Sequence, residues 1–204
     1  YYKISSFENN HLPLIDKVSK LKKPVLVSTG MASKNDLIDI LRIFKKNKND
    51  KLIFLKCVSS YPAVPGDFNL NVLKKYQREF KCLTGLSDHS LDNTAANVSV
   101  SLGARVFEKH ISLKNVKSLD SSFSTNENNF SIYVKSINDA FKSLGEAKYG
   151  AVKSEKASLQ ERRSIYVTKN VKKNDMITEE NISVIRPAYG LPPKMKSKIL
   201  KKCH

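Results

Sequence analysis

The chain has 204 residues, 40% of them hydrophobic, and a formal net charge of +17 at pH 7. A chain of this length can bury a substantial core, and no apolar run in it approaches the ~18 residues of a membrane-spanning helix, so we expect a globular protein with no membrane segment. Its lysines are spread along the sequence without interleaved aromatic residues, which predicts a solvated basic surface and no nucleic acid as partner.

The first two thirds of the sequence alternate between strand-like and helix-like segments. Runs rich in β-branched and apolar residues predict strands at residues 1–6, 25–29, 52–58, 82–87 and 105–112. Amphipathic stretches between and after them predict helices at residues 12–20, 34–46, 70–80, 92–102 and 127–144. Strand starts therefore recur every 23 to 30 residues, the spacing of βα units in a parallel sheet.

This βα repeat predicts an α/β fold, either a doubly wound sheet or the last five-eighths of a (β/α)8 barrel. No Gly-rich dinucleotide fingerprint or P-loop follows any strand, which lowers the nucleotide-binding option and favours the barrel. We therefore expect residues 1–146 to form part of a TIM barrel, from about strand four to strand eight.

The composition changes after this barrel segment. Residues 147–162 are polar and charged and predict a helical linker. In residues 163–204 an alternating run at 163–167 predicts a strand, and Thr178 is the expected cap of a short helical turn at 178–182. Prolines at 187, 192 and 193 exclude long regular elements. We expect a small β-rich module that ends before it is complete.

Two histidines follow neighbouring predicted strands. Alternate side chains of a strand share a face, so Ser87 and His89 lie on one face, as do Glu108 and His110. Both histidines then lie at the carboxyl ends of adjacent parallel strands, where α/β folds place their chemistry. A lone histidine is usually structural, but two at equivalent strand ends favour a site.

Polar side chains follow every predicted strand, and all of them are expected at one rim. Repeated hydroxyls together with a lysine suit a ligand that carries a phosphate and a carboxylate. Each serine could separately cap a helix, so the set rather than any single residue predicts a pocket. The candidates are Lys3, Ser6, Glu8, Ser28, Ser59, Tyr61, Ser87 and Glu108.

The motifs KISSFE, KPVLVSTGMAS, CVSSYPAV, GLSDHSLDN, GARVFEKHISL and DSSFS occur in the order found in the sialic acid synthase family, which this chain resembles. Residues 163–193 resemble the family's carboxyl-terminal antifreeze-like (SAF) domain. The resemblance implies condensation of phosphoenolpyruvate with an N-acetylated amino sugar. In that reaction C3 of phosphoenolpyruvate joins the sugar's aldehyde carbon, water adds at C2 and phosphate is released.

The resemblance also implies roles for individual residues. His89 and His110 would bind a divalent cation, Mn2+ or Mg2+, of which Mn2+ suits imidazole better. Asp120 would reach this metal through water and act as a general base, and Glu8 would contact the sugar as a hydrogen-bond acceptor or an acid/base. The phosphoenolpyruvate ligands would be Lys3, Ser6, Ser28, Ser59 and Ser87.

Two further residues would face the sugar. Tyr61 would line its pocket, although a Tyr-Pro turn could equally be structural. Arg186, in the SAF-like tail, would reach across a domain-swapped homodimer to the N-acetyl group in the partner's barrel. An arginine before a proline in a loop is otherwise usually a surface residue.

The motifs resemble more than one branch of the family, and these branches use different acceptor sugars. SFE on the first strand, DSSFS and GLPPK resemble the branch that makes pseudaminic acid from 2,4-diacetamido-2,4,6-trideoxy-altrose. LDN after GLSDH is closer to the branches that make N-acetylneuraminate and legionaminate. Alternatives of other classes are a Schiff-base aldolase, for which Lys23 and Lys56 lie outside the rim, and a basic nucleic-acid or glycan-binding module.

The cysteines predict the compartment of the protein, and the first residues predict whether the chain is part of a longer one. Cys57, Cys82 and Cys203 are odd in number and lack C-x-x-C spacing, which predicts reduced thiols in a cytoplasm. Residues 1–5 contain no signal peptide and no initiator methionine and lie within a predicted strand, so we expect the front of a longer protein to be missing. Such a half-barrel would have exposed sheet edges and would be unstable and inactive alone.

Overall fold

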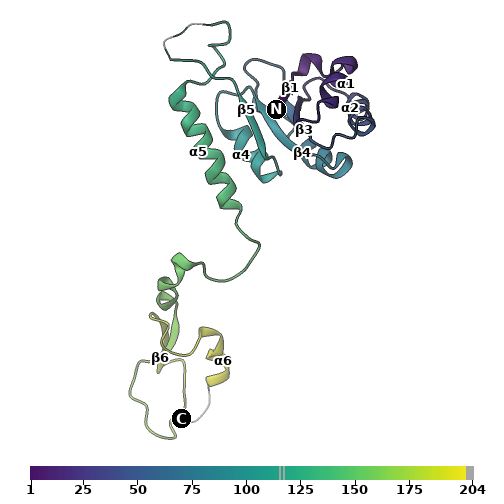
Figure 1. Cartoon of the computed structure of the whole chain (residues 1–204). Coiled ribbons are helices and arrows are strands. Elements are labelled where there is room, and N and C mark those ends of the chain that lie inside the picture. The colour runs from purple at the N-terminus through teal and green to yellow at the C-terminus, as the bar shows by residue number, and fades with distance from the viewer. Residues whose placement is uncertain (115, 117, 201–204) are drawn as a thin grey trace. The chain divides into compact units, whose positions relative to one another are not determined.

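The computed structural model describes residues 1–114, 116 and 118–200, and it divides into two compact units after Gly145. The first unit, residues 1–145, contains a five-stranded sheet in the order β1-β2-β3-β4-β5, with every neighbouring pair parallel (Figure 1). This confirms the predicted parallel α/β architecture. The strands are β1 (Tyr2–Ile4), β2 (Val25–Ser28), β3 (Leu52–Cys57), β4 (Leu83–Asp88) and β5 (Val106–Lys109).

The strand predicted at residues 105–112 ends earlier, at Lys109. Beyond it the chain leaves the sheet, because His110 O accepts a hydrogen bond from Thr125 N at 2.9 Å and Ile111 pairs with Thr125 in an isolated bridge. His110 therefore follows the strand directly without belonging to its ladder.

The helices of this unit follow the predicted spacing closely. The prediction at residues 92–102 is shortened to α4, and the one at 70–80 divides into α3 and a π-helical turn, Tyr76–Phe80. Ser33 begins α2 with a capping box closed by Asp36, and Asn126 caps α5. The helices are α1 (Leu12–Lys20), α2 (Lys34–Lys46), α3 (Val72–Lys75), α4 (Thr94–Ser101) and α5 (Glu127–Leu144).

The main core lies between the sheet and the helices α1 and α2. Alternate side chains of β2 and β3 point to this layer, so apolar residues at every second position are buried there. They pack against the apolar faces of the two helices and against the Tyr76 ring. The residues that form this cluster are Ile4, Ile15, Val25, Val27, Leu37, Ile40, Phe44, Leu52, Phe54 and Tyr76.

The opposite face of the sheet is concave. Lys3 lies on β1 and Glu108 on β5, the two outer strands, yet Lys3 Nζ is 3.0 Å from Glu108 Oε2. In a flat sheet four spacings of about 4.8 Å would separate these strands by nearly 20 Å, which two side chains cannot span. The sheet is therefore curled around this face as the open part of a barrel.

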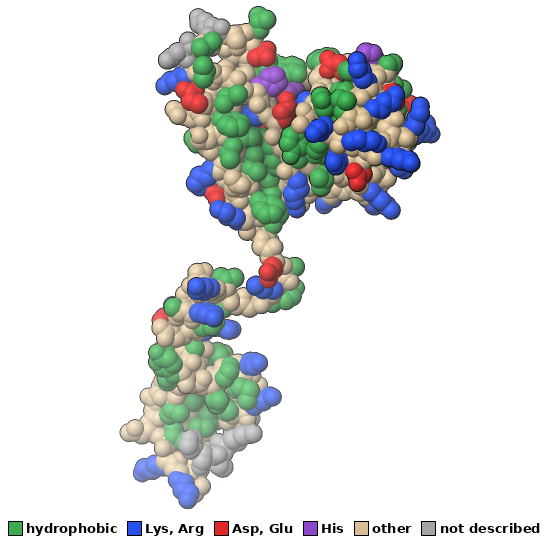
Figure 2. Space-filling model, viewed as in Figure 1, with side chains coloured by type: hydrophobic (Ala, Val, Ile, Leu, Met, Phe, Trp, Pro, Cys, Tyr) green, Lys and Arg blue, Asp and Glu red, His purple; other side chains and the backbone are tan. Residues whose placement is uncertain are grey.

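The two outer strands are covered less completely than the inner ones. All four residues of β5 keep some exposure, although the Lys109 side chain is almost fully buried, and Tyr2 on β1 is 40% exposed. Between β5 and α5 a groove of about 650 Å³ is lined largely by apolar side chains, among them Phe107, Phe130 and Phe141. Hydrophobic side chains gather beside α5 in Figure 2.

The second unit, which begins at Glu146, contains an antiparallel pair, β6 (Ser164–Val167) and β7 (Ile182–Ile185), and a short helix, α6 (Lys196–Ile199). Its small core contains Ile165, Ile177 and Ile182. The expected helical linker is broken into two 3-10 segments, Lys153–Glu155 and Ala157–Glu161. The expected helical turn at 178–182 is a turn that leads into β7, because Ile182 is already in the ladder.

In the described part of the chain, no helix combines the length and the apolar character needed to cross a membrane.

Candidate active site

The ends of the first three strands meet around Gly30. A Cβ at Gly30 would lie 2.3 Å from Ser59 Oγ and 2.5 Å from Ser6 Oγ, so only glycine fits between these two side chains. Gly30 N also donates a hydrogen bond to Ser6 Oγ at 3.1 Å. Two hydroxyls from different strand ends therefore converge in one small space, and the Gly30 amide orients Ser6 Oγ so that its own proton is free for an anionic oxygen.

A row of side chains crosses the concave face beneath these strand ends. Cys57, Ser87 and Glu108 are lateral neighbours in the ladder of β3, β4 and β5. Burial raises the pKa of Glu108, but the charge of Lys3 and a hydrogen bond from Ser87 lower it by more, so the net shift is below the ordinary value. Ser28 Oγ is buried on the same face and has no hydrogen-bond partner among the described residues.

The two histidines lie side by side at the open end of this face. Their ring centroids are 5.1 Å apart and their planes are inclined by 76°. His89 is 4% exposed, and its Nδ1 lies 2.8 Å from the carbonyl oxygen of Val58. Because Nδ1 donates to that carbonyl, Nε2 keeps its lone pair, which is the arrangement of a metal-binding imidazole.

Cys57 belongs to this site, and sequence reasoning missed it. Its sulfur lies 3.9 Å from both His89 Nδ1 and Ser59 Oγ. Burial raises the pKa of the thiol, but hydrogen bonds with His89 and Ser6 lower it by more, to about 7. Burial lowers the pKa of His89, and contact with Cys57 raises it by more. The two-residue spacing from Cys57 to Ser59 was the available signal, since it places both on one face.

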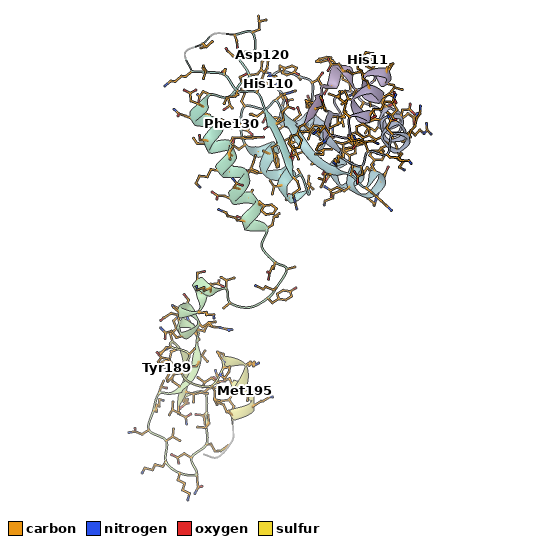
Figure 3. All side chains as sticks on the ribbon, in the orientation of Figure 1. His11, His110, Asp120, Phe130, Tyr189 and Met195 are labelled. Carbon is orange, nitrogen blue, oxygen red and sulfur yellow. The ribbon has the colours of Figure 1, made fainter. Side chains whose placement is uncertain are left out.

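Two aromatic rings, those of Tyr61 and Phe123, pack against the histidines. The Tyr61 ring centroid is 4.3 Å from that of His89, and Phe123 lies 4.7 Å from Tyr61 and 5.4 Å from His110. Asp120 Oδ2 is 3.6 Å from His110 Nδ1, and the two residues are labelled together in Figure 3. The segment after β5 therefore supplies both a carboxylate and an aromatic ring to the site; Phe123 was not predicted.

Glu8 lies near the rim, but its carboxylate is hydrogen-bonded to the nearby residue Ser5. Its carboxylate accepts hydrogen bonds from the backbone and the hydroxyl of Ser5, closing a capping box at the end of β1. The side chain of the next residue, Asn9, is buried and donates to the carbonyls of Ser28 and Gly30 at 3.2 and 3.0 Å. Asn9 thereby fixes the loop after β2, a structural role that the sequence did not indicate.

Arg186 lies in the second unit, directly after β7. It is exposed, and the peptide bond to Pro187 is cis. Arg186 and the histidines belong to different units, so the predicted contact of Arg186 with a sugar stays a prediction.

The donor set at the histidines fits a divalent cation. Among the residues that the structure describes, no three His, Cys, Asp or Glu side chains are grouped to hold an ion on their own. The two imidazoles can hold one between them, since metal–nitrogen bonds of about 2.1 Å from each ring are compatible with their separation. The other coordination positions would be left to water or substrate, as at catalytic metals.

Two of the curated relatives are named as synthases of sugar acids. The pseudaminic acid synthase of Campylobacter jejuni is 41% identical over 202 residues, which cover 98% of this chain and 59% of that protein. The N,N'-diacetyllegionaminic acid synthase of the same bacterium is 32% identical over 93% of this chain and 58% of that protein. The chain therefore spans somewhat more than half the length of the curated relatives it matches.

The fold has a solved counterpart. The crystal structure of the spore coat polysaccharide biosynthesis protein SpsE from Bacillus subtilis matches with a TM-score of 0.66 at 30% identity, over 97% of this chain and 61% of that one. The sequence profile of the NeuB family matches residues 1–149, the segment that holds all five parallel strands. This chain belongs to the NeuB family.

Proposed function

We propose that this chain carries the phosphoenolpyruvate- and metal-binding part of a cytoplasmic nonulosonic acid synthase. Such an enzyme joins C3 of phosphoenolpyruvate to the aldehyde carbon of an N-acetylated amino sugar and releases phosphate. The observation that carries the proposal is the pair of imidazoles 5.1 Å apart, on the same concave face as a cluster of hydroxyls and Lys3. Membership of the NeuB family supports this reaction class.

Phosphoenolpyruvate is assigned to the hydroxyl cluster. The hydroxyls of Ser6 and Ser59 converge from two strand ends, with Ser6 oriented by the Gly30 amide, and the buried hydroxyl of Ser28 points to the same face. Lys3 adds a positive charge, and its ammonium forms an ion pair with Glu108. We assign phosphate and carboxylate oxygens to these donors, with Ser87 beneath them, because charge-assisted hydrogen bonds bind such oxygens strongly.

The sugar aldehyde is assigned to the histidine end of the face. His89 and His110 would hold a divalent cation, Mn2+ or Mg2+, with Mn2+ the better match to imidazole. When bound, the cation supplies a Lewis acid for the aldehyde oxygen, which makes the carbonyl carbon more electrophilic. The rings of Tyr61 and Phe123 cover this end and would exclude water from one side of the sugar.

Two carboxylates are assigned to proton transfer. Asp120, which is exposed beside His110, would take the proton of the water that adds at C2, after which the C2–O bond to phosphate breaks. Glu8 would serve the sugar hydroxyls as an acceptor or an acid. It would first have to leave its cap on Ser5, so we rank its role below that of Asp120.

The acceptor sugar and the assembly are assigned from the named relatives and from the second unit. The relative at 41% identity is named a pseudaminic acid synthase, so we assign 2,4-diacetamido-2,4,6-trideoxy-altrose as the acceptor sugar. N-acetylneuraminate or legionaminate synthesis is the alternative. We further assign residues 163–204 as a SAF-like module that places Arg186 at the partner's sugar site in a domain-swapped homodimer.

The test is phosphate release from phosphoenolpyruvate with a panel of acetamido sugars. The chain is assayed together with the segment of the Campylobacter relative that it does not match. We expect release with the trideoxy-altrose sugar and loss of release with a chelator. Release with another acetamido sugar alone would replace the assigned acceptor, and activity that survives complete metal removal would contradict the histidine roles.

A matched pair of variants separates the site from its surroundings. Ser59→Ala should raise the KM for phosphoenolpyruvate, whereas Ser60→Ala should not, because Ser60 is exposed and its hydroxyl bonds the carbonyl of Pro62. Borohydride treatment with substrate should trap no covalent adduct. An adduct on Lys23 or Lys56 would favour the aldolase alternative.

A further inference from the structure

A buried ion pair lies directly behind the two histidines. Lys109 Nζ is 3.1 Å from Asp88 Oδ2, and the two side chains are 4% and 0% exposed. Asp88 precedes His89 in the chain and Lys109 precedes His110. Since successive side chains of a strand alternate between faces, the pair lies on the helix-covered side of the sheet. The hydroxyl cluster lies on the opposite, concave face.

The pair is part of a small network that encloses the backbone of His89. Ser90 N and Ser90 Oγ donate to Asp88 Oδ1 at 2.9 and 2.7 Å, and Lys109 Nζ donates to Ser90 O. The Lys109 ammonium also lies 5.1 Å from the centre of the Tyr133 ring on α5. Residues on both sides of His89 are therefore bonded to one side chain of β5.

The network lies where backbone pairing stops. Asp88 and Lys109 are the last register pair between β4 and β5, and β5 ends at Lys109. His110 is beyond that ladder, so hydrogen bonds between the two strands do not fix its distance from His89. The ion pair is the final cross-link between the strand ends.

Stability alone is a weak explanation for this arrangement. Two charges lose their hydration when they are buried, and apolar residues of similar volume often stabilise a protein equally well or better. The site already lies in a sheet with complete ladders on β2 to β4. A directional contact, in contrast, fixes where the strand ends lie.

We propose that Asp88 and Lys109 are positioning residues that hold the backbones at His89 and His110 at the separation one cation needs. The inference rests on the proposed function, because it assigns these residues to the metal site. Neither side chain would touch the metal or the substrates. The pair is neutral as a whole, so it would act through geometry and would leave the charge at the site unchanged.

The test uses a neutral replacement of the pair, Asp88→Asn together with Lys109→Met. The amide oxygen at position 88 can still accept the bonds of Ser90, and methionine keeps the volume of the lysine stem. Lys109→Met alone would be ambiguous, because it leaves a negative charge behind the metal that would itself attract a cation. The control is Lys135→Met with Asp139→Asn, the same chemical change at an exposed pair on α5.

The first readout is the affinity for Mn2+, measured from the EPR signal of the free ion. We expect the Asp88/Lys109 double variant to bind about 10- to 100-fold more weakly, the range found for groups that orient metal ligands. The control should stay within about twofold of the parent chain, because exposed ion pairs contribute little. Lys109→Arg, which can keep the charge and the bond to Asp88, should restore most of the affinity.

The second readout needs no metal. Nuclear Overhauser contacts between the imidazole protons of His89 and His110 report their distance in the metal-free chain, and we expect them to weaken in the double variant only. A folded double variant with unchanged Mn2+ affinity and unchanged ring contacts would overturn the proposal. If the double variant does not fold, Asp88→Asn alone is used, and the same two unchanged readouts overturn the proposal there.

The two hypotheses fail differently. If the parent chain binds no Mn2+, or binds it equally well after His89→Ala, the proposed metal site is wrong. In that case the ring contacts still decide whether the ion pair positions the histidines. If the parent binds Mn2+ through both histidines and the double variant does so equally well, only the positioning role is wrong.

Discussion

The inner strands of the barrel segment and its outer strands differ in how completely they are covered. On β3, Phe54 and Leu55 are fully buried, with helices on one side and the concave face on the other. On β5 Phe107 is only half-buried, and Tyr2 on β1 is 40% exposed. The site nevertheless spans both kinds of strand, from Lys3 on β1 to His110 after β5. The middle of the site is therefore held by strands that are paired on both sides. Its two ends lie on β1 and β5, the outer strands of the described sheet.

The largest effect is expected from adding a protein segment that can pair with the outer strands β1 and β5. Alone, the chain should release no phosphate from phosphoenolpyruvate with an acetamido sugar. Mixed or fused with the unmatched segment of the Campylobacter relative, it should gain turnover. Covering the edges and the groove between β5 and α5 would add about 3 kcal/mol of stability or more, equivalent to a rise in Tm of about 6–12 °C. Calorimetry and a phosphate assay measure the two effects.

The control for that experiment is the same segment with prolines in its strands, which cannot complete a sheet ladder. It should neither raise Tm nor restore turnover. Robust turnover by the chain alone would contradict the prediction, because the open edges would then be compatible with a working site.

Truncation of one aromatic ring in each region comes next. Phe54→Ala removes a side chain with no exposure, whose ring contacts Tyr76 and Phe80, and should cost about 3–5 kcal/mol of unfolding free energy. Phe107→Ala on β5 removes a half-buried ring beside the groove and should cost about half as much. Urea unfolding followed by circular dichroism compares them. Equal losses would show that β5 is as well packed as β3.

The fold was predictable from the sequence because the local signals agree with one another. Pro13 near the start of α1 and the Ser33 cap of α2 stand at the predicted helix ends, and both helices have their predicted bounds. The strands were found from their apolar runs. The end of β5 was not, because the bridge from Ile111 to Thr125 joins segments that no local pattern connects.

The site was only partly predictable for the same reason. Strand alternation was sufficient to place Ser87 with Glu108 and His89 with His110. It could not show that Lys3 reaches Glu108, because that ion pair depends on the curl of the whole sheet. Glu8 was expected at the substrates, and its local cap on Ser5 is a competing bond that a strand pattern does not contain.

The two histidines allow inner and outer strands to be compared within the site, because His89 follows the inner strand β4 and His110 follows the outer strand β5. His89→Ala and His110→Ala should each weaken Mn2+ binding about 100-fold, or about 2.7 kcal/mol. Only His89→Ala should also lower the unfolding free energy, because His89 is buried and bonded to Val58 O, whereas His110 is partly exposed. The control is His11→Ala, an exposed histidine at the start of α1.

Calorimetry of Mn2+ binding and urea unfolding separate the two effects. An equal loss of stability in both variants would show that the outer strand end is held as firmly as the inner one. Unchanged Mn2+ affinity in either variant would remove that histidine from the metal site.

The smallest expected effect concerns two buried tyrosines, one in each region. Tyr76 Oη donates to Thr29 Oγ1 at 3.2 Å beside the inner strands, so Tyr76→Phe should cost about 1 kcal/mol at pH 7. Tyr133 Oη, on α5 beside β5, is buried near the Asp88 carboxylate but makes no hydrogen bond of regular geometry in the described part of the chain, so Tyr133→Phe should cost less than Tyr76→Phe. Urea unfolding at pH 7 should therefore separate the two variants.

The Tyr76→Phe variant should also respond to alkali. Burial raises the pKa of Tyr76 above its ordinary value of 10, although the bond to Thr29 lowers it in part. The unfolded chain then loses this proton at lower pH than the folded chain, so the contribution of Tyr76 is complete below pH 10 and decreases as the pH rises above it. Tyr76→Phe has no phenol to ionise there, and its deficit should shrink between pH 7 and about 10.5. A deficit that is constant across this range would show that the Tyr76 phenol has the same pKa in the folded and unfolded chains.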